Sequence, residues 1–219
     1  NYYGRINYTY KEKYLFEALF RYDGSYLFPE DTRYGFFPGA SAGWVVSEEN
    51  FFKDNVSFLD YFKLKGSWGQ LGNDNVAPFQ FLASYGFSAT GLGDVYTTAY
   101  ETKVPNTNIT WETQTSANFG FDLRAINNRL SLGFEVFRNL RENILTLPNK
   151  TLPSYSGITP PAQNIGEFEN TGIEITAGFN GETNSGLTYN FSFNVSDSNN
   201  TLLFVDEPDF ADRPWQRET

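Results

Sequence analysis

The chain has 219 residues and a formal net charge of −10, with neither cysteine nor histidine. The lack of cysteine excludes disulfides, thiolate metal sites and thiol nucleophiles, and the lack of histidine removes the commonest general base and metal ligand. The negative charge argues against nucleic acid as a partner, because such binders usually carry a basic patch. No run approaches 18 apolar residues, so no transmembrane helix is expected, although a membrane β-barrel gives a much weaker signal per segment.

The start of the sequence indicates a piece of a longer protein. Its first residues, NYYGRINYTY, lack the basic segment and apolar core of a signal peptide, and the chain contains no methionine. We therefore expect a fragment that begins and ends inside its parent chain. The 22 Phe, 14 Tyr and 4 Trp favour strands and suit the aromatic girdles of membrane barrels.

Alternating apolar and polar residues predict four strands in the first third of the chain, because successive side chains on a strand point to opposite faces. These strands span residues 5–10, 14–23, 36–47 and 62–71. Leu15 and Leu19 interrupt the polar face of the second strand, which suggests packing on that side. Ser47 precedes two acidic residues and predicts the N-cap of a single helical turn. A short strand within residues 80–87 is expected in the connector that follows.

The most regular stretch is a predicted hairpin of two long strands. Residues 113–123 carry Thr, Ala, Phe and Leu at odd positions and Gln, Ser, Asn, Gly and Asp at even positions. After a turn at residues 125–128, residues 130–136 alternate in the same way. A tilted strand crosses a bilayer with about 9–11 residues, so the apolar face could meet lipid and the polar face an aqueous lumen. A soluble antiparallel sheet alternates similarly, so the hairpin alone does not decide.

The last third is predicted to contain a loop at 143–170 with four prolines, then strands at 172–181 and 187–197 joined by a turn at 182–186. The remainder reads as acidic and irregular.

Connector lengths alternate along the predicted strands. The connectors after odd-numbered strands are mostly short, and those after even-numbered strands are long, with residues 48–61 as the one departure. Short turns at one end and long loops at the other are typical of an outer-membrane barrel. We therefore predict an all-β fold: an antiparallel transmembrane β-barrel segment of about eight strands. The alternative is a secreted β-sandwich that binds carbohydrate, although a sandwich gives no reason for loop lengths to alternate.

Four motifs follow one another along nearly the whole chain. They are YLFEALFRYDGS (14–25) with GFFP (35–38) and SAGW (41–44); LKGSWGQLGNDN (64–75); NITWETQTSANFGFD (108–122) with NRL (128–130); and NIGEFENTGIE (164–174), echoed by RPWQRET (213–219). Each is weak alone, but their combination and order are specific. Through them the chain resembles the SusC/RagA family of TonB-dependent outer-membrane transporters of Bacteroidetes.

This resemblance implies a piece from the C-terminal half of a plugged barrel of about 22 strands. Residues 1–219 would all belong to one receptor barrel domain, and the plug and the TonB box are expected to be absent from this chain. The implied function is import of glycans or oligopeptides across the bacterial outer membrane. The implied partners are a SusD-like lipoprotein that lids the extracellular face, the TonB complex acting through absent parts of the parent chain, and membrane lipid.

The candidate site residues form two sets. Polar residues expected to face the lumen, where they solvate it or contact plug or substrate, are Glu17, Arg21, Asn118, Asp122, Arg129 and Glu135. Aromatic residues of the long connectors, suited to stacking on sugar rings or docking a partner, are Tyr85, Tyr96, Tyr155 and Trp215.

Two glutamates raise the possibility of an enzyme. Glu167 and Glu169 would share a strand face and so suit a glycosidase-like carboxylate pair. A structural role at the start of a strand is the favoured interpretation. We therefore expect no catalytic, metal or cofactor site.

Overall fold

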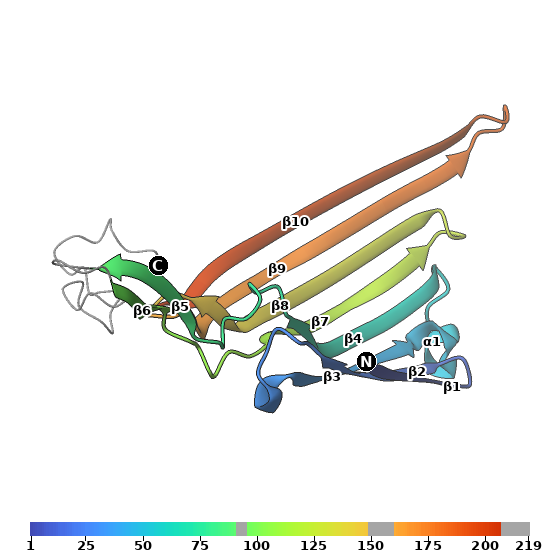
Figure 1. Ribbon diagram of the computed structural model, residues 1–219. Helices are drawn as coiled ribbons and strands as arrows, with labels where there is room; N and C mark the ends of the chain where they lie inside the picture. The colour runs from blue at the N-terminus through green and yellow to red at the C-terminus, as the bar shows by residue number, and fades with distance from the viewer. Residues whose placement is uncertain (91–95, 149–159, 207–219) are drawn as a thin grey trace.

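The computed structural model describes residues 1–90, 96–148 and 160–206. Eight strands form one antiparallel sheet in which each strand neighbours the next one of the sheet along the chain (Figure 1). These strands are β1 (Tyr2–Tyr10), β2 (Tyr14–Gly24), β3 (Tyr34–Val45), β4 (Leu59–Asn73), β7 (Glu112–Ala125), β8 (Leu130–Thr146), β9 (Gln163–Glu182) and β10 (Thr188–Phe204). The predicted all-β antiparallel fold is confirmed.

The other two strands of the described residues form a separate hairpin. It pairs β5 (Ser84–Thr90) with β6 (Tyr96–Lys103) and lies within the long connector between β4 and β7. The sequence predicted only a short strand there. A β-sandwich needs two sheets packed face to face, whereas the described chain forms one large sheet and this hairpin. The sandwich alternative is therefore wrong.

The two faces of the large sheet differ in chemistry, as the alternation predicted. Phe121 of β7 pairs with Leu64 of β4 and with Phe134 of β8, so one face is apolar. On the opposite face, Asp122 of the same strand pairs with Lys63. Because the side-chain period of a strand is two, this register places the alternating apolar residues of neighbouring strands on the same side. We call the two sides the apolar face and the polar face.

The inward leucines of β2 pack against their neighbouring strand. Leu15 pairs with Gly43 and Leu19 with Gly39, both on β3. The leucine methyl groups lie 3.2 Å from where a Cβ would stand on either glycine. The predicted interruption of the polar face thus fills space that these glycines leave open.

Short connections join the strands at one end of the sheet. Between β3 and β4 the chain forms a 3-10 turn, η2 (Val46–Glu48), and one helical turn, α1 (Asn50–Lys53). The N-cap of α1 is Glu49, and its side chain makes no capping hydrogen bond. The prediction that Ser47 caps this turn is wrong, because Ser47 lies within η2. None of the described helices is long and apolar enough to cross a membrane.

β8, β9 and β10 exceed their predicted lengths by the most. β8 continues to Thr146 and β9 begins at Gln163, so the predicted loop at 143–170 is too long at both ends. β10 continues to Phe204, where an irregular tail was expected. In the added segments, which lie toward the long connections, polar residues occur on both faces. The hydrophobic alternation therefore disappears there, although backbone pairing continues.

The long connections pack together at the other end of the sheet. Phe28, Phe37, Ile109 and Trp111 form a buried cluster, in which Phe28 and Ile109 are 0% exposed. The Trp111 ring lies 5.2 Å from that of Phe28 and 5.3 Å from that of Phe37. The Trp111 indole donates a hydrogen bond to the Arg33 carbonyl. This small core holds the loops in fixed positions above the sheet.

Candidate functional site on the polar face

Lys65 lies at the centre of a charge cluster built from three strands. Its ammonium is 3.2 Å from Asp122 Oδ1 and 3.2 Å from Glu135 Oε2. Lys65 pairs with Gly120 on β7, and Gly120 pairs with Glu135 on β8. Because Gly120 has no side chain, the lysine reaches across β7 to the far strand. Both carboxylates were predicted from the sequence but the lysine was not, although the alternation in FKLKG (62–66) places it on the polar face.

Two further predicted residues form ion pairs on or beside β2. Glu17 accepts a hydrogen bond of 2.8 Å from Arg5 Nε on β1. Arg21 lies 2.9 Å from Asp23 Oδ2 on its own strand. Asn118 of β7 donates a hydrogen bond to Ser67 Oγ of β4. The polar face therefore satisfies its charged and amide groups largely from neighbouring strands.

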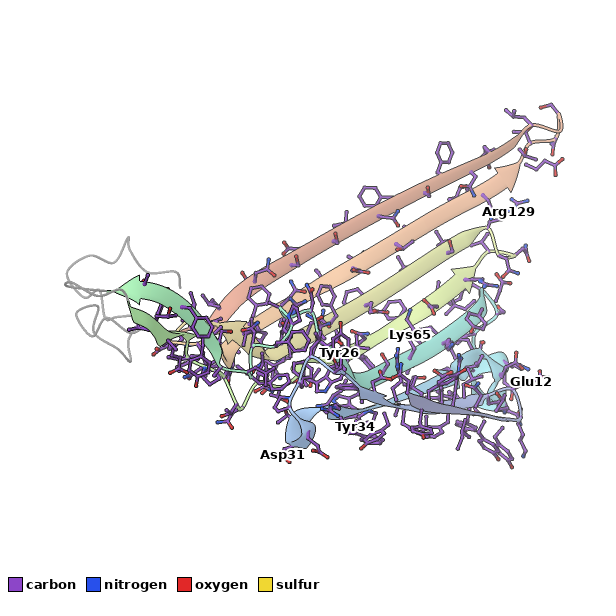
Figure 2. All side chains as sticks on the ribbon, in the orientation of Figure 1. Glu12, Tyr26, Asp31, Tyr34, Lys65 and Arg129 are labelled. Atoms are coloured by element: carbon purple, nitrogen blue, oxygen red, sulfur yellow. The ribbon has the colours of Figure 1, made fainter. Side chains whose placement is uncertain are left out.

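Arg129 occupies a different place from the other predicted polar residues. Figure 2 shows Lys65 on the body of β4 and Arg129 at the turn between β7 and β8. Its N–H donates to the Ile126 carbonyl, and its carbonyl accepts from the Asn180 N–H. The backbone of Arg129 thus links the β7–β8 turn to β9.

A hollow of about 450 Å³ lies over the middle of the polar face. Its polar lining includes Asn7, Glu17, Ser41, Lys63, Lys65, Ser67, Asn118 and Glu135. The groups offer both donors and acceptors, and small side chains keep the floor open. Within the described ranges, no group of three or more His, Cys, Asp or Glu side chains is placed to hold a metal ion. The chemistry offered is hydrogen bonding and ion pairing.

The aromatic candidates lie on or near the β5–β6 hairpin, or outside the described residues. Tyr85 on β5 is 64% exposed, and Phe87 on the same face is 73% exposed. Tyr96 begins β6 and pairs with Thr90. Tyr155 and Trp215 lie outside the described residues. The hairpin lies beyond the end of the large sheet (Figure 1), and its aromatic side chains are exposed there.

Glu49 anchors the short-turn end of the sheet, a role that the sequence did not reveal. It accepts hydrogen bonds from the Tyr14 hydroxyl (2.7 Å), the Lys13 ammonium (3.0 Å) and the Trp44 indole (3.2 Å). These donors, led by Tyr14, lower the pKa of the Glu49 carboxyl to about 2. The carboxylate thus ties together the β1–β2 turn, β3 and α1.

The two glutamates considered for catalysis lie on β9. Glu169 is held by Arg138 of β8, whose Nε donates a hydrogen bond of 2.6 Å to Glu169 Oε1. Glu169 pairs with Leu140 and Arg138 with Ala117, which places both charged groups on the apolar face rather than in the hollow. An arginine salt bridge at this position is a structural tie between strands.

Known proteins resemble this chain along nearly its whole length. A family model described as TonB dependent receptor-like, beta-barrel matches residues 1–217. TonB-dependent receptor SusC of Bacteroides thetaiotaomicron is 31% identical over 218 residues, which cover 97% of this chain and 21% of SusC. TonB-dependent receptor P3 of Formosa agariphila is 34% identical over 208 residues, which cover 94% of this chain and 20% of that protein.

A solved structure shares the fold. The RagAB peptide importer in its open-open state superposes with a TM-score of 0.77 at 24% identity, covering 92% of this chain and 22% of that chain. The chain therefore spans about a fifth of the length of the relatives that it matches.

Proposed function

Because the chain belongs to the TonB dependent receptor-like β-barrel family, we propose that it forms part of the wall of an importer of glycans or oligopeptides. The chain is part of an outer-membrane barrel. We propose further that residues 1–219 all belong to a single barrel domain. The observation that carries this function is the division of one continuous sheet into an apolar and a polar face.

The polar face supplies the proposed lumen wall. Glu17, Arg21, Asn118, Asp122 and Glu135 lie on the strands and would meet plug or substrate from the side. Their ion pairs and hydrogen bonds hold the side chains close to the wall, which leaves the hollow open. Arg129 would act at the rim, since it lies at a hairpin turn.

The loop end of the sheet supplies the proposed partner surface. A SusD-like surface lipoprotein would dock on the loops that the Phe28–Trp111 cluster fixes. The β5–β6 hairpin supports this placement, because an isolated two-stranded hairpin is only marginally stable in water and this one exposes Tyr85, Phe87 and Tyr100. TonB would act through other parts of the full-length protein. Tyr155 and Trp215 stay candidates for the same contacts.

Growth on defined nutrients tests this function. A strain that lacks the full-length protein is expected to lose growth on one polymer, either a glycan or an oligopeptide mixture, and to keep growth on its monosaccharides or free amino acids. The full-length gene supplied on a plasmid should restore growth. Normal growth of the deletion strain on every polymer that the wild type uses would contradict the proposal.

A further inference from the structure

One row of paired residues, with one residue from each strand, crosses the whole sheet. Every side chain in this row is apolar or aromatic and lies on the apolar face. Its members are Tyr10, Tyr14, Trp44, Leu64, Phe121, Phe134, Ile175 and Val195. Three of the eight, Tyr10, Tyr14 and Val195, are substantially exposed. An exposed apolar row of this extent is unfavourable in water and suits contact with lipid hydrocarbon.

Above this row, toward the long loops, the apolar face turns polar early on β8, β9 and β10. Val136 and Ile173 pair with each other, and the next residues on the same face are Arg138 and Thr171. On β10, Asp197 follows Val195 on this face. The Arg138–Glu169 ion pair lies just above, and an ion pair on the lipid side is costly within hydrocarbon. The hydrocarbon contact on these strands therefore ends near Val136 and Ile173.

On β2 and β3 the same face stays aromatic much further along the strands. Phe20 stacks on Phe36 at 6.1 Å, and Tyr22 stacks on Tyr34 at 5.3 Å. Tyr22 lies eight residues above Tyr14, which shares its row with Val195. We call the apolar band the part of the apolar face that carries only apolar or aromatic side chains. Its upper limit thus lies eight residues higher on β2 than on β10.

The lower limit of the band rises in the same direction. On β10 the band begins at Tyr189, six residues below Val195, and Tyr189 contacts the Phe179 ring of β9 at 6.1 Å. On β2 the band begins at Tyr14, the first residue of that strand. Figure 1 shows the matching stagger of the turns, with the β9–β10 turn reaching furthest from the loop end.

These two limits give the angle of the band. A rise of six to eight residues over the six steps from β10 to β2 corresponds to about 35–43°, taking about 3.3 Å per residue and about 4.8 Å between strands. Closed barrels tilt their strands by about 35–45° to the barrel axis. The slope of the apolar band therefore equals the strand tilt of a barrel whose axis stands along the membrane normal.

We infer that the bilayer crosses this sheet obliquely, and that its hydrocarbon contacts different rows on different strands. On β1, β2 and β3 the lipid contact reaches the level of Tyr22. On β8, β9 and β10 the segments above Val136, Ile173 and Val195 stand outside the hydrocarbon, on the side of the long loops. The inference rests on the proposed outer-membrane barrel and adds which residues meet lipid.

Single cysteines in one row test this inference. Ala18 of β2 and Thr171 of β9 belong to the same hydrogen-bonded row, which runs through Ala40, Trp68, Ala117 and Arg138. The variants Ala18→Cys and Thr171→Cys are made in the full-length protein, with Ala177→Cys on β9 as the lipid-facing control. Intact outer membranes are treated with a water-soluble maleimide, and each site is read by mass spectrometry. Thiols react as thiolates, which form in water and not in hydrocarbon.

The expected result is labelling at Thr171→Cys at least tenfold above that at Ala18→Cys and Ala177→Cys, with all three labelled after unfolding in detergent. Equal labelling at Thr171→Cys and Ala18→Cys, with Ala177→Cys protected, would overturn the oblique band and leave the barrel intact. Labelling of all three in folded membranes at the level of the unfolded protein would overturn the membrane barrel itself.

Discussion

At the scale of single residues, Glu49 makes the short-turn end of the sheet dependent on pH. Its carboxyl has a pKa of about 2, below its ordinary value of 4.5, because Tyr14, Lys13 and Trp44 donate hydrogen bonds to the charged form. A carboxyl with a lowered folded-state pKa stabilises the fold above its ordinary pKa, and this contribution is lost as the pH falls toward the folded-state value. The loss therefore falls between about pH 4.5 and pH 2.

The variant Glu49→Gln tests this pH dependence. It is expected to lower the thermal unfolding temperature of the full-length protein at pH 7, and the difference from wild type should shrink as the pH falls from 4.5 to 2.5. Glu48→Gln is the matched control, since Glu48 pairs with the exposed Lys53 and such surface pairs contribute about 0–1 kcal/mol. A Glu49→Gln deficit that stays constant with pH would show that the charge is not responsible.

Ile126 adopts an unfavourable backbone conformation in the β7–β8 turn. Its φ is 59°, whereas a β-branched residue in the left-handed region is strained by roughly 1–2 kcal/mol. Its side chain is 53% exposed, so little burial is lost on replacement. Ile126→Asn is expected to stabilise the folded protein by about 1 kcal/mol, because asparagine tolerates this region.

The control for Ile126→Asn is Asn127→Gly in the same turn. Asn127 also has a positive φ of 54°, but asparagine is already tolerated there, so the expected change is within about 0.5 kcal/mol. Both variants are compared with wild type by thermal unfolding in detergent. Destabilisation by Ile126→Asn would mean that the isoleucine makes contacts that outweigh its strain.

At the scale of whole elements, Gly120 allows β7 and β8 to approach. A Cβ at Gly120 would collide with the backbone of Phe134, and Gly120 lies between Lys65 and Glu135 in the strand register. Gly120→Ala is therefore expected to destabilise the barrel by about 1–3 kcal/mol. Gly66 on β4 offers the comparison, since its nearest atoms lie 3.7 Å from such a Cβ.

The measurement for Gly120 is unfolding in denaturant of the full-length protein and both variants. Gly66→Ala should change stability by no more than about 0.5 kcal/mol. Equal effects of the two substitutions would show that strand propensity, and not the approach of β8, sets the cost.

Asn164 links three segments at the loop end. Its Nδ2 donates to the carbonyls of Thr110 (2.9 Å) and Asn143 (2.8 Å), and its Oδ1 accepts from the Thr110 N–H (3.1 Å). Asn164→Ala leaves these groups without their partner, which is expected to destabilise the loop end by about 1–3 kcal/mol. We expect faster proteolysis of the segment before β7 in the otherwise folded protein.

Limited proteolysis of intact cells checks this prediction by the site and rate of cleavage. Asn170→Ala is the control, because the side chain of Asn170 donates a hydrogen bond to the exposed Asn200 on the adjacent strand. Cleavage rates that rise equally in the two variants would show that Asn164 does not hold the loops specifically.

At the scale of the whole molecule, the sequence predicts what depends on local pattern. The alternation around Phe121 and Phe134 fixes strand, face and turn, and the structure confirms all three. The same signal disappears from Arg138 onward, where Arg138 and Glu142 fall on one face and Asn139 and Arg141 on the other, while backbone pairing still continues. On β9 and β10 the predicted strands therefore end close to where the apolar residues end, short of where hydrogen bonding ends.

Contacts between distant segments cannot be predicted from local sequence patterns. Glu49 takes hydrogen bonds from residues 35 and 36 positions away, and no periodicity marks such a contact. The Phe28–Trp111 cluster likewise joins residues of two connectors to Phe37 of β3, and composition only predicts that the connectors are loops. The ion pairs of Lys65 could not be predicted because its partners Asp122 and Glu135 become neighbours only through the strand register.

The oblique band makes a prediction about charge at two positions of one strand. Phe134 lies in the fully apolar row, and Leu140 lies six residues higher on the same face, beside Thr115 and Glu169. An arginine facing lipid near the bilayer midplane costs about 2–4 kcal/mol, and near the interface only about 0–1 kcal/mol. Phe134→Arg should therefore strongly reduce the folded fraction in denaturant titrations of the full-length protein in lipid vesicles, whereas Leu140→Arg should leave it almost unchanged. Equal costs at the two positions would mean that hydrocarbon reaches Leu140, and the strands would then stand less far above the membrane than their side chains indicate.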